Sequence, residues 1–339
     1  MAPRTILIGS RTTAERDGRG SGLTAWHPAD PDWAESDRLK LTNPSWITAP
    51  GPGPVYVLHG DGGTLSVVEV SPEGHLTRSQ TVPAGGRNPV HCARIGGHLL
   101  VANYATGTVA AHPVRADGLL EPVSGTVSLG DGVGGDRLSH PHQIIPDGDT
   151  GRFLVPDKGL DAVVTLELTA DGDLRVLDRE ATAPGSGPRH GVIVGEQLFV
   201  VGELDSSLIT LTRDVTGIFR VRDATGTLPE GADATESTAA GIAHFPNRAM
   251  LVVSNRGADS LSVFHTGPAA PRLVHTVPCA GRFPRFIVRY PQDHRDGLLV
   301  AHEYGDTVSW HSAGDLADGR AGYRTVAHTG SPVCVTPLP

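Results

Sequence analysis

The chain has 339 residues, of which 28 are basic and 37 acidic, so its formal net charge is −9. This charge argues against a nucleic acid or an anionic membrane surface as the partner. No apolar run approaches the roughly 18 residues of a membrane-spanning helix, and the N-terminus lacks the apolar segment of a signal peptide, so we expect a cytoplasmic protein.

Short apolar runs that end in a few polar residues recur seven times, about 49 residues apart. We expect each run to form a strand; the runs span residues 5–10, 55–59, 99–103, 153–157, 198–203, 250–256 and 298–303. A strand repeat of about 40 to 50 residues is typical of a β-propeller. The sequence therefore predicts an all-β fold, a seven-bladed β-propeller that forms a single domain over residues 1–339.

A short turn, in most copies with a proline, precedes every run except the first; the turns lie at residues 43–45, 88–90, 140–142, 187–190, 238–240 and 283–285. One further copy, at residues 331–333, has no run after it. We predict that residues 331–337 form the inner strand of the blade begun by residues 4–10. Such closure of the ring hides the strand edges that would otherwise pair with other chains.

Three polar stretches, residues 14–22, 130–137 and 226–237, are predicted to be long loops. The cysteines Cys92, Cys279 and Cys334 are widely spaced, odd in number and placed in or beside apolar strands. We predict three buried free thiols in a reducing compartment.

The turns and the ends of the runs carry residues that a simple turn does not need. The turns contain His91, His140, His142, Arg189, His190, His244 and Arg285, and the runs end in His59, Asn103, Asp157, Lys158, Glu203, Asn255, Arg256, His302 and Glu303. Loops of several blades meet at the mouth of a propeller's channel, so some of these groups are candidates for acid/base catalysis and anion binding. An Asp or Asn at a strand end can instead cap the following turn. For Asp157, Asn103 and Asn255 we give this structural role the same weight as a functional role.

In sequence order, several of these segments resemble the seven-bladed lactonase family, which includes the propeller type of 6-phosphogluconolactonase and the fungal carboxymuconate-lactonizing cyclase. The resemblance covers essentially the whole chain, and its main segments are Leu99–Tyr104, His140–His142, Val155–Asp161, Gly185–His190, Glu203–Leu204, Ser254–Gly257 and Pro284–Phe286.

The resemblance implies a metal-free site at the channel mouth that uses no cofactor. It implies His142 and Glu203 as the acid/base pair and Arg189 and Arg256 as anion binders. Further substrate contacts are expected from His140, His190, Asn103, Asp157, Arg285, His302 and Glu303.

Two segments depart from the family pattern. The family usually has Asn-Gln-like residues where this chain has His302-Glu303, and commonly Leu-Gly-Thr-Asp-Arg where it has Lys158-Gly159-Leu160-Asp161-Ala162. One strand end therefore gains two titratable groups and another lacks an arginine, which leaves the substrate open.

The leading functional hypothesis is hydrolysis of a small anionic lactone by a monomer or weak homo-oligomer. His142 or Glu203 would activate water, and Arg189 or Arg256 would hold the oxyanion or the substrate's anionic group. A lactonizing cyclase or isomerase would use the same groups, and a non-catalytic binding scaffold is a further alternative. A calcium-dependent site built from Glu203, Asn255 and Asp157 is disfavoured, because two arginines nearby would repel the cation.

Overall fold

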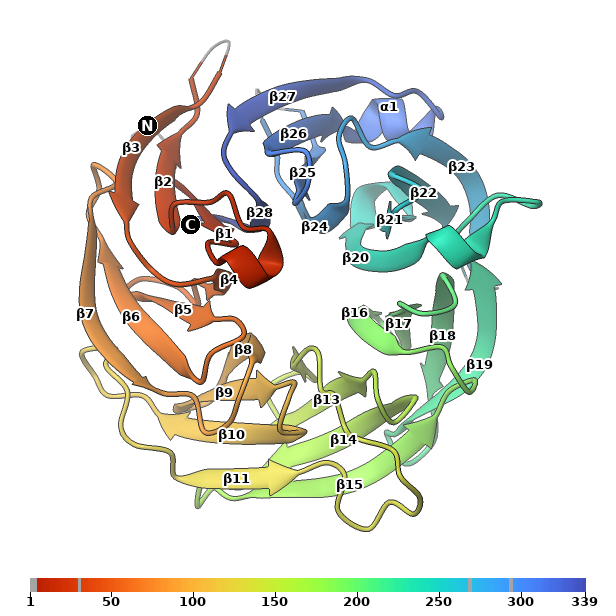
Figure 1. Ribbon diagram of the computed structural model, residues 1–339. Coiled ribbons are helices and arrows are strands. Elements are labelled where there is room, and N and C mark those ends of the chain that lie inside the picture. Colours follow the sequence, from red (N-terminus) through yellow and green to blue (C-terminus); the bar gives the residue numbers. More distant parts are fainter. Residues whose placement is uncertain (1–4, 30–31, 268–269, 293–294) are drawn as a thin grey trace.

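Seven four-stranded antiparallel sheets form a ring around a central channel (Figure 1). The computed structural model describes residues 5–29, 32–267, 270–292 and 295–339. The arrangement confirms the predicted all-β propeller with seven blades.

The blades follow one another around the ring in chain order, and each is numbered here from its position in that order. Blade 1 contains β28 (Pro332–Pro337), β1 (Ile6–Ser10), β2 (Leu23–His27) and β3 (Ala34–Leu39); blade 2 contains β4 (Pro44–Thr48), β5 (Val55–His59), β6 (Thr64–Val70) and β7 (Leu76–Pro83). Blade 3 contains β8 (Pro89–Ile95), β9 (His98–Asn103), β10 (Thr108–Pro113) and β11 (Gly125–Ser128); blade 4 contains β12 (Ile145–Pro146), β13 (Arg152–Asp157), β14 (Ala162–Leu168) and β15 (Leu174–Ala181). Blade 5 contains β16 (Pro188–Val194), β17 (Gln197–Gly202), β18 (Ser207–Arg213) and β19 (Phe219–Gly226); blade 6 contains β20 (Thr238–Phe245), β21 (Met250–Arg256), β22 (Ser260–His265) and β23 (Arg272–Pro278). Blade 7 contains β24 (Pro284–Arg289), β25 (Gly297–His302), β26 (Thr307–Ser312) and β27 (Tyr323–His328).

The C-terminal strand β28 closes the ring as predicted. It lies at the inner edge of blade 1 and pairs antiparallel with β1, with Ile6 opposite Pro337 and Gly9 opposite Cys334. Residue 4, with which the predicted pairing began, lies outside the described residues.

The second strand of each blade is apolar in its middle, because both of its faces are buried there. In β17, Leu198 and Val200 pack with Leu154 of blade 4, whereas Phe199 and Val201 pack with Leu251 of blade 6. Successive side chains of a strand point to opposite faces, so each of these strands contributes to two interfaces between blades.

The loops contain little regular structure. The predicted loop at residues 14–22 includes the short 3₁₀ helix η1 (Ala14–Arg16), which lies beside the central opening and is the red coil of Figure 1. The remaining helices of the described residues are η2 (Ala234–Glu236), η3 (Pro246–Arg248) and α1 (Ala313–Ala317). None of the helices seen in the described ranges is long and apolar enough to cross a membrane.

The three cysteines are buried free thiols, as predicted. Burial raises the pKa of each thiol to about 12, so all three remain protonated at neutral pH.

Candidate functional site at the channel mouth

The second strand of every blade ends in two residues with opposite orientations. The first lies opposite a residue at the start of the blade's inner edge, which is a proline in every blade except blade 6, where it is Ala239; the residues in this first position are Ser10, His59, Asn103, Asp157, Gly202, Asn255 and His302. All of them except Gly202 have a side chain, and it is buried. The next residues along the chain are Arg11, Gly60, Tyr104, Lys158, Glu203, Arg256 and Glu303. Six of these seven, all except Gly60, line one cavity at the channel mouth.

The inner strands contribute a second ring of side chains through irregular pairing. The register shifts after the first residue of the inner strand in five blades and after the second residue, Ala239, in blade 6, which is typical of a β-bulge. In blade 7 the residue skipped by this shift is Arg285, and in blade 5 the skipped pair is Arg189 and His190. A bulge redirects a side chain, and Arg285 accordingly faces the cavity.

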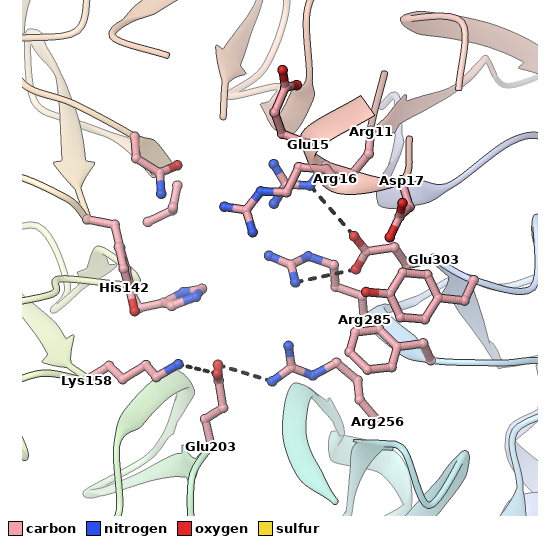
Figure 2. Close-up of a pocket in the computed structure, with 15 residues that line it drawn as sticks. Arg11, Glu15, Arg16, Asp17, His142, Lys158, Glu203, Arg256, Arg285 and Glu303 are labelled. Carbon is pink, nitrogen blue, oxygen red and sulfur yellow. Dashed lines mark hydrogen bonds and ion pairs between the residues drawn. The ribbon is translucent and has the colours of Figure 1, made fainter. Parts of the chain in front are cut away.

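The cavity has a volume of about 350 Å³, enough for a small metabolite. Figure 2 shows charged side chains that enter it from several blades. Its lining consists of Arg11, Glu15, Arg16, Asp17, Asn88, Val90, Tyr104, His142, Lys158, Glu203, Arg256, Phe283, Arg285, Glu303 and Tyr304.

Glu203 lies among three cations at the base of the cavity. Its Oε1 forms an ion pair with Lys158 Nζ, and its Oε2 lies 2.8 Å from Arg189 Nε and 3.2 Å from Arg256. Burial alone would raise the pKa of Glu203, but the charges of Arg256, Arg189 and Lys158 outweigh it and hold that pKa far below the usual range. Glu203 is therefore a permanently ionised anchor that fixes the three cations.

His142 lies in the cavity wall and is neutral at physiological pH. Burial, followed by the charges of Arg189, Arg285 and Lys158, lowers the pKa of its imidazole well below the ordinary value. Its Nδ1 is buried and has no hydrogen-bond partner among the described residues. A neutral imidazole in this position can accept a proton.

Glu303 is held more loosely than Glu203. Its Oε1 lies 3.7 Å from Arg11 Nε, and its Oε2 lies 3.5 Å from Arg285. The two carboxylates occupy the same position in blades 5 and 7, yet only Glu203 is enclosed by close ion pairs.

Aromatic rings fill the channel beneath the cavity. The Trp46 ring centroid lies 4.1 Å from that of His91, 5.6 Å from that of His190 and 5.5 Å from that of Phe286. These four residues come from the inner strands of blades 2, 3, 5 and 7, so their contacts reach across the channel. The cavity therefore has a floor, with His142 packed 5.1 Å from His190 at its edge.

The structure brings together the four residues to which the sequence assigned catalysis. His142, Glu203 and Arg256 line the cavity, and Arg189 is buried outside the lining, in contact with Glu203. Arg285 and Glu303 also line it. His190 belongs to the floor, where its Nδ1 accepts a bond from Arg189. His140 stacks on Tyr104, at 4.4 Å between ring centroids, and is not part of the lining.

Three of the predicted substrate contacts point into their blades instead. Asn103 donates to Ala84 O, and the Asp157 carboxylate accepts bonds from Ser139 Oγ and from the backbone N–H groups of His140, Gly159 and Leu160. His302 is fully buried and contacts Ser309 Oγ at 2.8 Å. The prediction that these three residues contact the substrate is corrected. Each occupies the first position at its strand end, where the side chain points into the blade and away from the cavity.

The calcium alternative fails for the same reason. Asn255 Oδ1 accepts a hydrogen bond from Thr227, and Asp157 is occupied by its own turn, so neither oxygen ligand joins Glu203 at the cavity. Within the described ranges, no cluster of three or more His, Cys, Asp or Glu residues is arranged to hold a metal ion.

Sequence reasoning missed the contribution of the first loop. Arg11 and Arg16 line the cavity, although residues 14–22 were expected to be only a loop. Arg11 follows Ser10 as Glu203 follows Gly202 and Arg256 follows Asn255, so the repeat itself contained this signal. Nothing comparable marks Arg16, because its place depends on how the loop folds.

Comparison with known proteins is consistent with this geometry. The chain is 30% identical to the 6-phosphogluconolactonase of Bacillus subtilis over 288 residues, which cover 79% of this chain and 80% of that protein. It is 31% identical to the 6-phosphogluconolactonase of Pectobacterium carotovorum over 68% of each chain. The structure of a periplasmic gluconolactonase from Pseudomonas aeruginosa matches with a TM-score of 0.85 and 25% identity over 99% of both chains. The family model described as "Lactonase, 7-bladed beta-propeller" matches residues 5–337, so the chain belongs to the seven-bladed propeller lactonase family.

Proposed function

We propose that the protein hydrolyses the lactone ring of a small anionic substrate in the cavity at the channel mouth. The observation that carries this proposal is a neutral histidine beside a carboxylate that anchors three cations. Around the cavity the positive charges outnumber the negative ones, with Arg11, Lys158, Arg189, Arg256 and Arg285 against Glu203, Glu303 and Asp61, which contacts Arg11. An excess of positive charge in a chain of net charge −9 favours an anionic ligand.

In the proposed reaction, His142 removes a proton from a water molecule as the water oxygen bonds to the lactone carbonyl carbon. Arg256 and Lys158 stabilise the negative charge that develops on the carbonyl oxygen. The tetrahedral intermediate then expels the ring oxygen, which takes the proton back from His142 and leaves an open-chain hydroxy acid. Burial is the main cause of the lowered pKa of His142, followed by the charges of Arg189, Arg285 and Lys158; an anionic substrate would offset only these charges and so raise that pKa.

The geometry favours His142 over Glu203 as the proton carrier. Both oxygens of Glu203 are engaged by Lys158, Arg189 and Arg256, whereas Nδ1 of His142 has no hydrogen-bond partner among the described residues. Glu203 instead keeps Arg189, Arg256 and Lys158 in place, which makes it a positioning residue.

The test is hydrolysis of gluconolactone, 6-phosphogluconolactone and muconolactone, measured by acid release with the spontaneous rate subtracted. His142→Gln should lower kcat/KM by roughly 10²–10⁴-fold on the substrate that the wild type hydrolyses best. His140→Gln is the matched control, since His140 lies outside the lining, and it should change kcat/KM much less. The wild-type kcat/KM should also keep its neutral-pH value to below pH 6.5, because the pKa of His142 is lowered.

A wild type that hydrolyses none of these lactones would contradict the proposal, and ring closure of the corresponding open-chain acids would then indicate a lactonizing enzyme. Equal loss in His142→Gln and His140→Gln would remove His142 from the proton-transfer step.

A further inference from the structure

We propose that His91 and Gln143 are positioning residues, which hold the chain segment that carries His142 in the place from which its imidazole serves the lactone carbonyl. This inference rests on the proposed function and names the contacts that keep its proton-accepting group in place. Neither residue lines the cavity at the channel mouth. Both lie on the inner edges of the blades and act through the backbone that follows His142.

The segment that carries His142 is the least regular part of the inner ring. The inner strand β12 of blade 4 has only two residues, whereas the inner strands of the other six blades have five to eight. Residues 142–144 lie before β12 and outside any strand. His142 N donates to Pro156 O of β13 at 3.0 Å, but the next two residues are not paired with β13. A segment with so few ladder bonds needs other contacts to fix its position.

No side chain of the described residues orients the His142 imidazole through its Nδ1, which is buried without a hydrogen-bond partner. A histidine that acts on a ligand is usually oriented by a partner on its other nitrogen. The place of this ring is therefore set by its backbone and by packing against His190 and Tyr104, whose ring centroids lie 5.1 and 5.9 Å away. Displacing a reacting group by about 1 Å can cost about 10²-fold in rate, so the position of the backbone matters.

His91 holds the segment from blade 3. Its Nδ1 accepts a hydrogen bond from the backbone N–H of Ile144 at 3.3 Å. Burial lowers the pKa of His91 to about 3, so this nitrogen stays unprotonated and able to accept at neutral pH. The ring is itself fixed, because it is buried and packs against Trp46 with 4.1 Å between the ring centroids. The acceptor that Ile144 meets is therefore held at a defined place.

Gln143 holds the segment from the other side, by a bond to blade 5. Its Oε1 accepts a hydrogen bond from the backbone N–H of Gly191 at 2.6 Å. Gly191 directly follows His190, so this bond joins the two inner segments next to the point where the rings of His190 and His142 pack together. A Cβ at Gly191 would lie 3.2 Å from Ile145 Cδ1, so the missing side chain lets the two blades approach.

A second cavity, of about 580 Å³, adjoins the same segment. Its lining includes His91, Gln143 and Ile144, together with residues farther along the inner edges such as Thr48 and Pro146. Side chains of the described residues do not fill this space, so the hydrogen bonds to blades 3 and 5 supply restraint that packing would otherwise give. Loss of either bond should let the segment shift, and His142 with it.

The test compares two replacements of His91 that differ mainly in one acceptor. His91→Leu and His91→Asn both remove the ring and are of similar size, but only asparagine offers an oxygen to Ile144 N. On the best lactone, His91→Leu should lower kcat about tenfold and leave KM within about twofold, because His91 does not touch the substrate. His91→Asn should keep kcat within about threefold of the wild type. Gln143→Met, which removes the other acceptor at nearly constant shape, should behave as His91→Leu does.

A second readout needs no turnover. In protein with isotopically labelled histidine, the Cε1–H resonance of His142 is identified by its absence in His142→Gln. This resonance should shift or split in Gln143→Met, and it should lie farther from its wild-type position in His91→Leu than in His91→Asn. His244→Leu is the matched control, because His244 lies on the inner strand β20 of blade 6 and lines neither cavity. It should leave kcat and the His142 resonance unchanged.

Equal kcat values and equal His142 resonances in His91→Leu and His91→Asn would overturn the inference, as would a rise in KM without a fall in kcat. If melting curves show that His91→Leu does not fold, Gln143→Met makes the same test on the other bond. If the wild type hydrolyses no lactone and the resonance still responds to the lost acceptors, only the proposed reaction fails. If lactones are hydrolysed and neither kcat nor the resonance responds, only the positioning role fails.

Discussion

Two neighbouring residues at the end of each second strand point in different directions in this propeller. The first is enclosed by its own blade, as Asp157 and His302 are, and the second reaches the channel mouth, as Lys158 and Glu303 do. A step of one residue along a strand reverses the direction of the side chain. Residues adjacent in sequence and similar in chemistry therefore divide into scaffold and site, and the division repeats around the ring.

In three blades the first of these two residues, which belongs to the scaffold, forms the same kind of hydrogen bond. Three of these residues hydrogen-bond a serine seven positions later, on the next strand: His59 with Ser66, Asn255 with Ser262, and His302 with Ser309. The polar groups that look catalytic in the sequence are here satisfied inside a blade, as buried polar groups generally are.

The largest effect on stability is expected at Asp157. Replacement by Ala removes the acceptor of four hydrogen bonds and leaves buried donors unpaired. We expect a loss of about 3 kcal/mol in the free energy of unfolding, measured by denaturant titration. Lys158→Met, one residue further, should cost less, about 1 kcal/mol, since Glu203 keeps Arg189 and Arg256 as partners.

Equal losses for the two variants would contradict the division into scaffold and site. If Asp157→Ala does not fold, Asp157→Asn retains one acceptor oxygen and should give an intermediate loss.

A smaller effect should distinguish the two cavity carboxylates. Glu203→Gln leaves Arg189 and Arg256 buried without their counter-charge, and we expect a loss of about 2 kcal/mol in unfolding free energy together with reduced turnover. Glu303→Gln removes only contacts of 3.5 and 3.7 Å and should cost less than about 1 kcal/mol. If Glu303→Gln proves the more destabilising change, the assignment of Glu203 as the anchor is wrong.

The smallest effect is a change in acid stability from one scaffold histidine. Burial, with a lesser contribution from His311, lowers the pKa of His302 to about 3, so the unfolded chain takes up this proton first as the pH falls below about 6.5. The stability linked to His302 is therefore present above pH 6.5 and is lost progressively toward pH 3. Between pH 7.5 and 5.5 the wild type should lose about 1 kcal/mol more than His302→Asn.

Asparagine is the matched replacement, because Asn255 occupies the same position in blade 6. The measurement is the free energy of unfolding at several pH values; parallel curves for wild type and variant would show that His302 does not titrate with unfolding.

Much of the fold could be predicted because it follows from repetition. The period of the apolar runs indicated seven blades, and the unmatched run and turn at the two ends of the chain indicated their pairing, which β1 and β28 confirm. These features depend on local strand patterns and on the need to bury both faces of each blade's second strand, and both are visible in a single sequence.

The division of neighbouring polar residues between blade and cavity was decided only by the tertiary structure. From the sequence, Glu203, Arg256, Asn103 and His302 were all candidate site residues. The sequence could not separate them, because the blades beside a strand decide which of its faces is buried. Arg16 lines the cavity where Asp61 contacts it and where its loop is held by the turns of the neighbouring blades 2 and 7. Local patterns determined the strands, whereas contacts between residues distant in the chain determined which side chains meet at the channel mouth.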